Sequence, residues 1–104
     1  MSEHHYHQVG ELNKSIIRRH VRLQRAAIRT CYESGLRRNP ELAGTIVASF
    51  KIEPDGTVTD SDVEGGPEGV RHCIAGVVAG IRFPAAYKSR VQTNVRYPFR
   101  FRPI

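Results

Sequence analysis

The sequence predicts an α+β fold in which two helices pack on one face of a three-stranded antiparallel sheet. Three observations predict it. A helical pattern without proline or glycine covers residues 11–34, a hairpin pattern covers residues 44–65, and a strict alternation of apolar and polar residues covers residues 91–101. A second helical pattern follows the hairpin, so the elements come in the order helix, strand, strand, helix, strand.

The first predicted helix runs from about Glu11 to Ser34. Its apolar residues recur at three- and four-residue steps, which places them on one helix face. They are Ile17, Val21, Ile28, Cys31 and Tyr32, with Leu12 and Ile16 widening the stripe at its start. Arginines fill much of the remaining circumference, which is typical of a solvated face. Gly35 suits the position just after a helix, and Asn39-Pro40 disfavours further helix before the first strand.

The hairpin begins with a strand in which every second residue, from Ile46 to Ile52, is apolar. Residues 53–57, with the sequence EPDGT, contain the proline, aspartate and glycine that favour a tight reversal. On the return strand Val58 and Val63 are five positions apart and would face opposite sides. We therefore expect a β-bulge between them, near residues 60–62.

The second predicted helix begins near Pro67 and ends before Phe83-Pro84, and residues 85–90 are expected to form a loop. The last strand, Val91 to Phe101, has one apolar, largely aromatic face and one face that carries arginines. Pro98 cannot donate a hydrogen bond to a neighbouring strand, so this strand is expected at an edge of the sheet or at an irregularity in it.

The order of the strands follows from their composition. The first strand is the most apolar, so we place it centrally, with the return strand on one side. The last strand reaches the other side by a right-handed crossover over the second helix, which gives the strand order 2-1-3. Both helices then cover one face of the sheet, and the other face meets water.

The 104 residues suffice for one small domain, which we assign to residues 11–104, with residues 1–10 as a flexible tail or linker. The histidines of the tail, His4, His5 and His7, fit a polar tail better than a metal site. The formal net charge of +6 raises the alternative of a nucleic-acid- or anionic-lipid-binding module, since the basic residues concentrate in the first third. Base stacking needs exposed aromatic rings, however, and those of the last strand are expected in the core. We therefore expect no nucleic-acid partner.

The two cysteines, Cys31 and Cys73, lie on the apolar stripes of the two predicted helices and should face the same interior. Their spacing does not fit a structural zinc site. A disulfide is favoured, and closing so long a loop would stabilise the fold by about 4 kcal/mol. Two buried free thiols remain the alternative. A disulfide would indicate an oxidising compartment such as the periplasm, and we then expect the chain to be part of a longer, exported protein.

An enzyme finds little support in the sequence. His20 and His72 are single histidines with no nearby nucleophile pattern, and the carboxylates Asp60, Asp62 and Glu64 lack the spacing of a calcium loop. We expect no catalytic residue, no metal site and no cofactor.

Several motifs resemble the C-terminal domain of the TonB family. They are the stretch Gly44 to Ile52, the turn Pro54 to Val58, the segment Gly80 to Pro84 and the final stretch Val95 to Phe101. Cys31-Tyr32-Glu33, Cys73-Ile74 and Asn39 to Gly44 look most like the AgmX/PglI C-terminal variant, which is linked to gliding motility. The resemblance covers about residues 16–103. The Tyr-Pro element that precedes the first helix of ordinary TonB domains is replaced here by a long basic helix.

The resemblance implies a periplasmic, non-enzymatic domain at the end of an envelope-spanning protein that is anchored in the inner membrane. Such domains add an extended segment of an outer-membrane or periplasmic protein to the edge of their last strand and transmit motion driven by the proton-motive force. Gliding-motility machinery is the expected setting, with nutrient uptake as the alternative. Motor proteins in the membrane would be reached through the rest of the longer chain. The domain is expected to be a monomer or a strand-swapped dimer. The expected partner-binding residues are Val91, Thr93, Val95, Arg96, Tyr97, Arg100 and Phe101.

Overall fold

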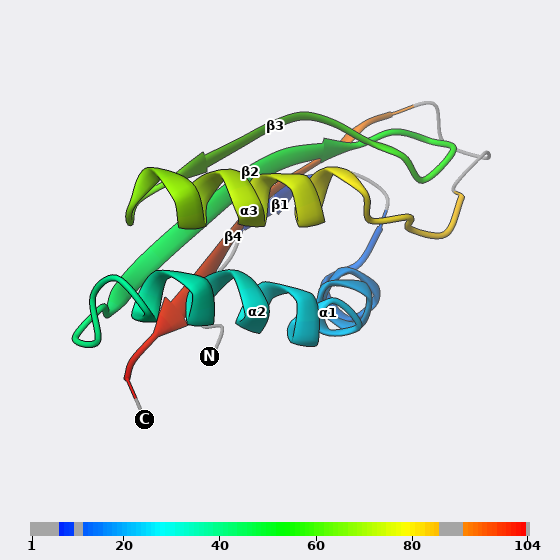
Figure 1. The fold of residues 1–104 in the computed structure, drawn as a ribbon. Helices are drawn as coiled ribbons and strands as arrows, with labels where there is room; N and C mark the ends of the chain where they lie inside the picture. Colours follow the sequence, from blue (N-terminus) through cyan, green and yellow to red (C-terminus); the bar gives the residue numbers. More distant parts are fainter. Residues whose placement is uncertain (1–6, 10–11, 86–90, 104) are drawn as a thin grey trace.

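The computed structural model describes residues 7–9, 12–85 and 91–103. Along the chain it contains β1 (His7–Val9), α1 (Lys14–Arg22), α2 (Arg25–Leu36), β2 (Gly44–Ile52), β3 (Val58–Glu64), α3 (Glu68–Ala79) and β4 (Thr93–Phe101). The helices lie on one face of the sheet, and α2 runs beside α3 (Figure 1). The predicted loop at residues 85–90 falls almost wholly outside the described residues.

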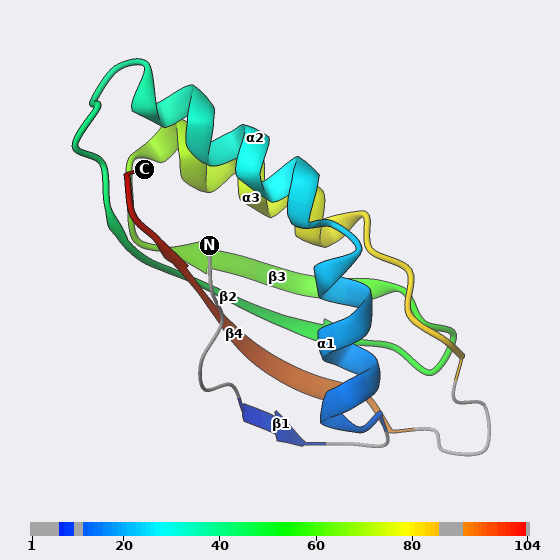
Figure 2. The ribbon, with the colours of Figure 1, turned by 90° about the horizontal axis from the view of Figure 1, so that it is seen from below.

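The sheet confirms the predicted class and the predicted order of the three strands. Its full order is β1-β4-β2-β3, and every neighbouring pair is antiparallel. β2 is central among the three predicted strands, with β3 on one side and β4 on the other. The added strand is β1, which pairs with the outer side of β4 (Figure 2). The assignment of residues 1–10 to a flexible tail is therefore wrong at His7–Val9, because three residues are too few for a periodic pattern to reveal a strand.

The predicted bulge is present. Ser49 pairs with Asp62 and Lys51 pairs with Thr59, so two residues of β3 oppose the single residue Phe50. Asp60 takes a φ of 49°, in the left-handed region that aspartate tolerates better than most residues. The bulge leaves Val63 on the buried face of the sheet.

The expected single first helix is two helices, α1 and α2, with a break at Leu23 and Gln24. The amide of Gln24 donates to the carbonyl of Val21 at 3.0 Å, a tighter turn than that of an α-helix. No glycine or proline marks the break. Its reason is tertiary: a straight helix over residues 14–36 would extend about 35 Å, whereas the break turns α1 across the sheet while α2 stays alongside α3 (Figure 2).

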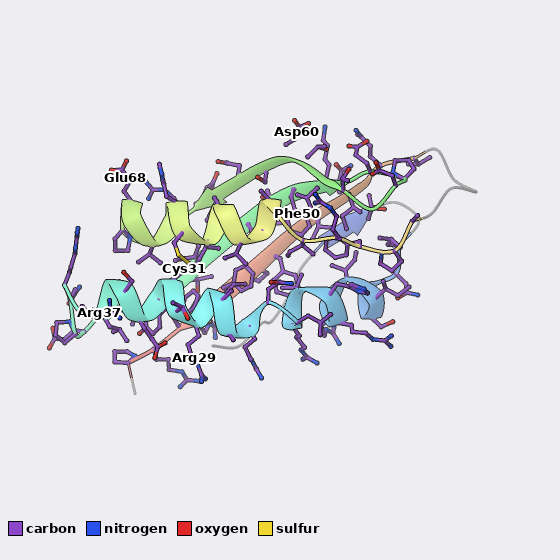
Figure 3. The ribbon with its side chains drawn as sticks, turned by 45° about the vertical axis from the view of Figure 1, so that its right-hand side comes forward. Arg29, Cys31, Arg37, Phe50, Asp60 and Glu68 are labelled. Atoms are coloured by element: carbon purple, nitrogen blue, oxygen red, sulfur yellow. A yellow bond between two sulfur atoms is a disulfide. The ribbon has the colours of Figure 1, made fainter. Side chains whose placement is uncertain are left out.

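Helices α2 and α3 are joined by a disulfide between Cys31 and Cys73, whose Cα atoms are 5.5 Å apart (Figure 3). Cys31 is buried, but Cys73 lies at the exposed rim of α3, so the expectation that both cysteines face the interior holds only for Cys31. Gly35 does not follow the helix as expected but lies within α2. A Cβ atom on Gly35 would come within 2.5 Å of the Val70 side chain, so the glycine lets the two helices approach closely.

The segment after α3 closes one end of the core by docking on the β2–β3 turn. The amide of Phe83 donates to the carbonyl of Gly56 at 2.9 Å, and the Phe83 ring lies between those of His20 and Phe50. In the same turn the Asp55 carboxylate accepts hydrogen bonds from the hydroxyl and the amide of Thr57, which lowers the pKa of Asp55. The EPDGT turn is thus a docking point as well as a reversal.

Candidate functional site

Strand β4 has the two faces that the sequence predicts. Its odd-numbered residues are buried, from Thr93 at one end to Phe101 at the other, and Tyr97 in the middle is fully buried. The side chains of Arg96 and Arg100 are exposed on the opposite face of the sheet. Aromatic rings therefore anchor the strand, while arginines mark its solvated side.

The outer edge of β4 is partly covered. β1 pairs with Asn94–Arg96, so the expectation of an open edge along the whole of residues 91–101 is wrong for this stretch. The physical reason is that an uncovered strand offers unpaired backbone groups, which a neighbouring segment of the same chain can satisfy. Beyond Arg96, no described residue pairs with the outer side of β4.

Pro98 reveals which backbone groups of β4 point outward. The ladder between β2 and β4 is unbroken from Gly44–Phe101 to Ile52–Thr93, and it includes the pair Val47–Pro98. Because proline has no N–H, an unbroken ladder requires that the backbone groups of residue 98 point away from β2. The same then holds for Arg100, two residues further on. Its N–H and C=O, with the C=O of Pro98, form the outward-facing part of the edge past β1.

The face of the sheet that points away from the helices has a basic part and an acidic part. Arg96 and Arg100 lie over β4, whereas Asp62 and Glu64 lie over β3, with β2 between them. Helix α2 carries more arginines on the other side of the molecule. In Figure 3 Arg29, from α2, and Arg37, just past its end, extend away from Asp60 and Glu68.

A groove of about 300 Å³ lies where the end of β4 meets α2. Its lining is mainly apolar and includes three charged residues: Arg29, Tyr32, Glu33, Leu36, Pro40, Phe101, Arg102 and Pro103. Sequence reasoning missed this groove. Pro40 and Pro103 stand out in the sequence, but no local pattern indicates that residues more than sixty positions apart line one groove.

Tyr32 lines the groove and contacts the elements around it. Its ring stacks on that of Phe101 with centroids 4.7 Å apart, and its hydroxyl donates to the backbone carbonyl of Leu42. A tyrosine hydroxyl is protonated at neutral pH and can donate this hydrogen bond, and burial raises the pKa of Tyr32 further. Through these two contacts Tyr32 connects the helix to the strand and to the loop that follows the helix.

The expected partner-binding residues fall into three groups. Thr93, Val95, Tyr97 and Phe101 are in β4 but buried, and by the alternation that turns residue 98 outward their backbone N–H and C=O groups point toward β2. Phe101 also lines the groove. Arg96 and Arg100 are in β4 and exposed. Val91 lies outside the strand, because β4 begins at Thr93, the residue that pairs with Ile52 at the end of β2.

The other polar candidates lie apart from one another. The Nδ1 of His20 is 2.9 Å from the carbonyl oxygen of Ile16, and His72 lies 3.8 Å from Glu68 on the surface of α3. His4 and His5 lie outside the described residues. Within the part of the chain that the structure describes, no three histidine, cysteine, aspartate or glutamate side chains gather as a metal site would require.

Comparisons with protein-family models, with curated proteins and with solved structures found no match. Among the described residues, no helix combines the length and the apolar character needed to cross a membrane. Proposals on function therefore depend on the geometry of this chain and on the motifs in its sequence.

Proposed function

We propose that this chain is a non-enzymatic protein-interaction domain that binds an extended segment of a partner by β-strand addition to β4. The observation that carries the proposal is the outward-facing backbone of Arg100, past the end of β1. An added strand would accept a hydrogen bond from the N–H of Arg100 and donate one to its C=O. The opposite edge of the sheet, β3, suits this role less, because its bulge and its acidic side chains interrupt regular pairing.

The surroundings of the edge suggest the chemistry of the segment. Side chains of an added strand alternate between the two faces of the sheet. Those on the helix side would approach the groove beside Phe101, which suits an apolar side chain. Those on the other side would lie near Arg96 and Arg100, which favour acidic groups. The proposed partner segment therefore alternates apolar and acidic residues.

The proposed setting is the periplasm, in a longer protein that is anchored in the inner membrane. The disulfide between Cys31 and Cys73 supports an oxidising compartment. The motifs that resemble the TonB C-terminal domain, and its AgmX/PglI variant in particular, support a partner in the outer membrane or periplasm. On this proposal the domain couples motion driven by the proton-motive force to that partner, in gliding machinery or in nutrient uptake.

Arg100→Pro tests strand addition without disturbing the fold. The variant removes one outward N–H at a position where the neighbouring Pro98 shows that the ladder with β2 tolerates proline. A photo-crosslinker at position 100 first identifies the partner segment in a solubilised cell envelope, and a synthetic peptide of that segment then serves as the probe. We expect Arg100→Pro to weaken peptide binding about tenfold or more. The hydrogen bond from the N–H of residue 100 is lost, and the added strand of the peptide no longer fits beside the proline.

Arg100→Gln is the matched control, because it removes the charge and keeps the N–H. We expect it to weaken binding less than Arg100→Pro and to preserve the peptide's protection of the residue 100 amide from hydrogen exchange. A peptide that binds Arg100→Pro as tightly as the wild type would contradict strand addition. So would a segment that crosslinks equally well from Asp62 on β3.

Deleting residues 1–10 should increase binding of the same peptide. β1 contributes only three residues to the ladder, and its removal uncovers Asn94–Arg96 for a longer added strand. We expect a faster association and a lower Kd, because no competing strand has to leave. Size-exclusion chromatography should also show more dimer, since two uncovered edges can pair with each other. An unchanged Kd would mean that the partner does not use the part of the edge that β1 covers.

A further inference from the structure

The break between α1 and α2 exposes a large apolar side chain in the middle of a basic surface. Leu23 is 70% exposed, although most apolar residues of the two helices are buried. Two shallow hollows meet at this residue. One is lined by Ser15, Arg18, Arg19, Arg22 and Leu23, and the other by Arg22, Leu23, Arg25, Ala26, Arg29, Thr30 and Glu33. We call the residues of both hollows the Leu23 surface.

The charge of the Leu23 surface is strongly positive. It holds five arginines and one carboxylate, that of Glu33. Arg19, Arg25 and Arg29 are exposed, and none of the three forms an ion pair with a residue that the structure describes. Arginines gathered without acidic partners repel one another, and an anionic surface would relieve that repulsion.

We propose that the Leu23 surface docks on a bilayer that contains anionic phospholipids. The arginines would contact the head groups, and Leu23 would enter the boundary between head groups and acyl chains. Leu23 distinguishes this occupant from nucleic acid, which offers phosphates but no apolar phase to receive a leucine. No exposed aromatic ring among the described residues of this surface is available for base stacking either. The surface lies on α1 and α2, and it adjoins the groove beside Phe101 at Arg29 and Glu33, which line both.

Co-sedimentation with vesicles tests the proposal. The probes are vesicles of phosphatidylcholine alone, vesicles of equal parts phosphatidylcholine and phosphatidylglycerol, and a short DNA duplex. We expect binding to the mixed vesicles that weakens with salt, and little binding to phosphatidylcholine. The double variant Arg25→Gln, Arg29→Gln should bind the mixed vesicles about 25-fold more weakly, since each arginine near an anionic surface contributes about fivefold.

Arg37→Gln, Arg38→Gln is the matched control, because it removes the same charge just past the end of α2. It should reduce binding far less, and an equal loss would mean that only net charge matters and would overturn the proposal. Leu23→Gln should weaken vesicle binding about tenfold and leave duplex binding unchanged. Absence of binding to the mixed vesicles, or no effect of Leu23→Gln on it, would also overturn the proposal.

Leu23→Trp supplies a second measurement, since the sequence contains no other tryptophan. We expect its fluorescence to shift to shorter wavelength with mixed vesicles and to stay unchanged with the DNA duplex, because only a bilayer removes the indole from water. An unshifted spectrum with mixed vesicles would show that residue 23 remains in water and would overturn the proposed docking.

Discussion

Replacing both cysteines, Cys31→Ser and Cys73→Ser, is expected to lower the free energy of unfolding by about 4 kcal/mol. The disulfide closes a loop with a sequence separation of 42, so its loss gives the unfolded chain many more conformations. Small domains have total stabilities of about 5 to 15 kcal/mol. The variant should therefore unfold at a much lower denaturant concentration, measured by circular dichroism in urea.

Wild-type protein in reducing agent is the control that separates the covalent bond from the substitutions. It should unfold close to the double variant, with a small difference because a serine at the buried position 31 is polar. If the domain carries load, the double variant should also unfold at lower force in single-molecule pulling, since the bond shortens the segment that force can extract. Equal stability of the oxidised wild type and the variant would contradict a stabilising disulfide.

Gly56→Ala is expected to destabilise the fold by about 3 kcal/mol. Gly56 has a φ of +91°, which disfavours any side chain, and a Cβ atom would lie 2.0 Å from the backbone carbonyl oxygen of Phe83. Backbone cannot move aside as a flexible side chain can. The substitution should push the segment after α3 off the turn and break the hydrogen bond from Phe83 to Gly56.

Gly76→Ala makes the same chemical change, but we expect it to stabilise the fold. Gly76 lies inside α3, where an added Cβ would meet no atom within 4 Å. Alanine favours helix over glycine, so this variant should be more stable by about 0.5 to 1 kcal/mol. Thermal unfolding of both variants checks the pair. If Gly56→Ala unfolded at the same temperature as the wild type, Phe83 would not dock on the turn.

The sheet was largely predictable because strand periodicity is a local property. Alternation over Ile46 to Ile52 and over Val91 to Phe101 identified two strands, the second of which begins two residues later than predicted, at Thr93. The five-residue spacing of Val58 and Val63 identified the bulge between them. The stripe that holds Cys31 placed this cysteine in the core, whereas its disulfide partner Cys73 lies at the exposed rim of α3. Each of these predictions used only the pattern of apolar and polar side chains within one element.

The features that define the candidate site depend on contacts between distant segments. β1 was missed because three residues show no period, and its strand exists only through pairing with β4. The break at Leu23 was missed because the sequence there favours helix, whereas packing against both the sheet and α3 requires a turn. The groove beside Phe101 likewise needs residues from α2 and from the end of the chain.

The sequence by itself determined β2, β3, β4 and α3, the order of those three strands and the burial of the aromatic face of β4, because the period of apolar residues decides which side of an element leaves water. Only the tertiary structure decided which part of the β4 edge stays uncovered, where Leu23 is exposed and how the groove forms. These features arise where elements from different parts of the chain compete for the same surface, and no local pattern records the outcome of that competition.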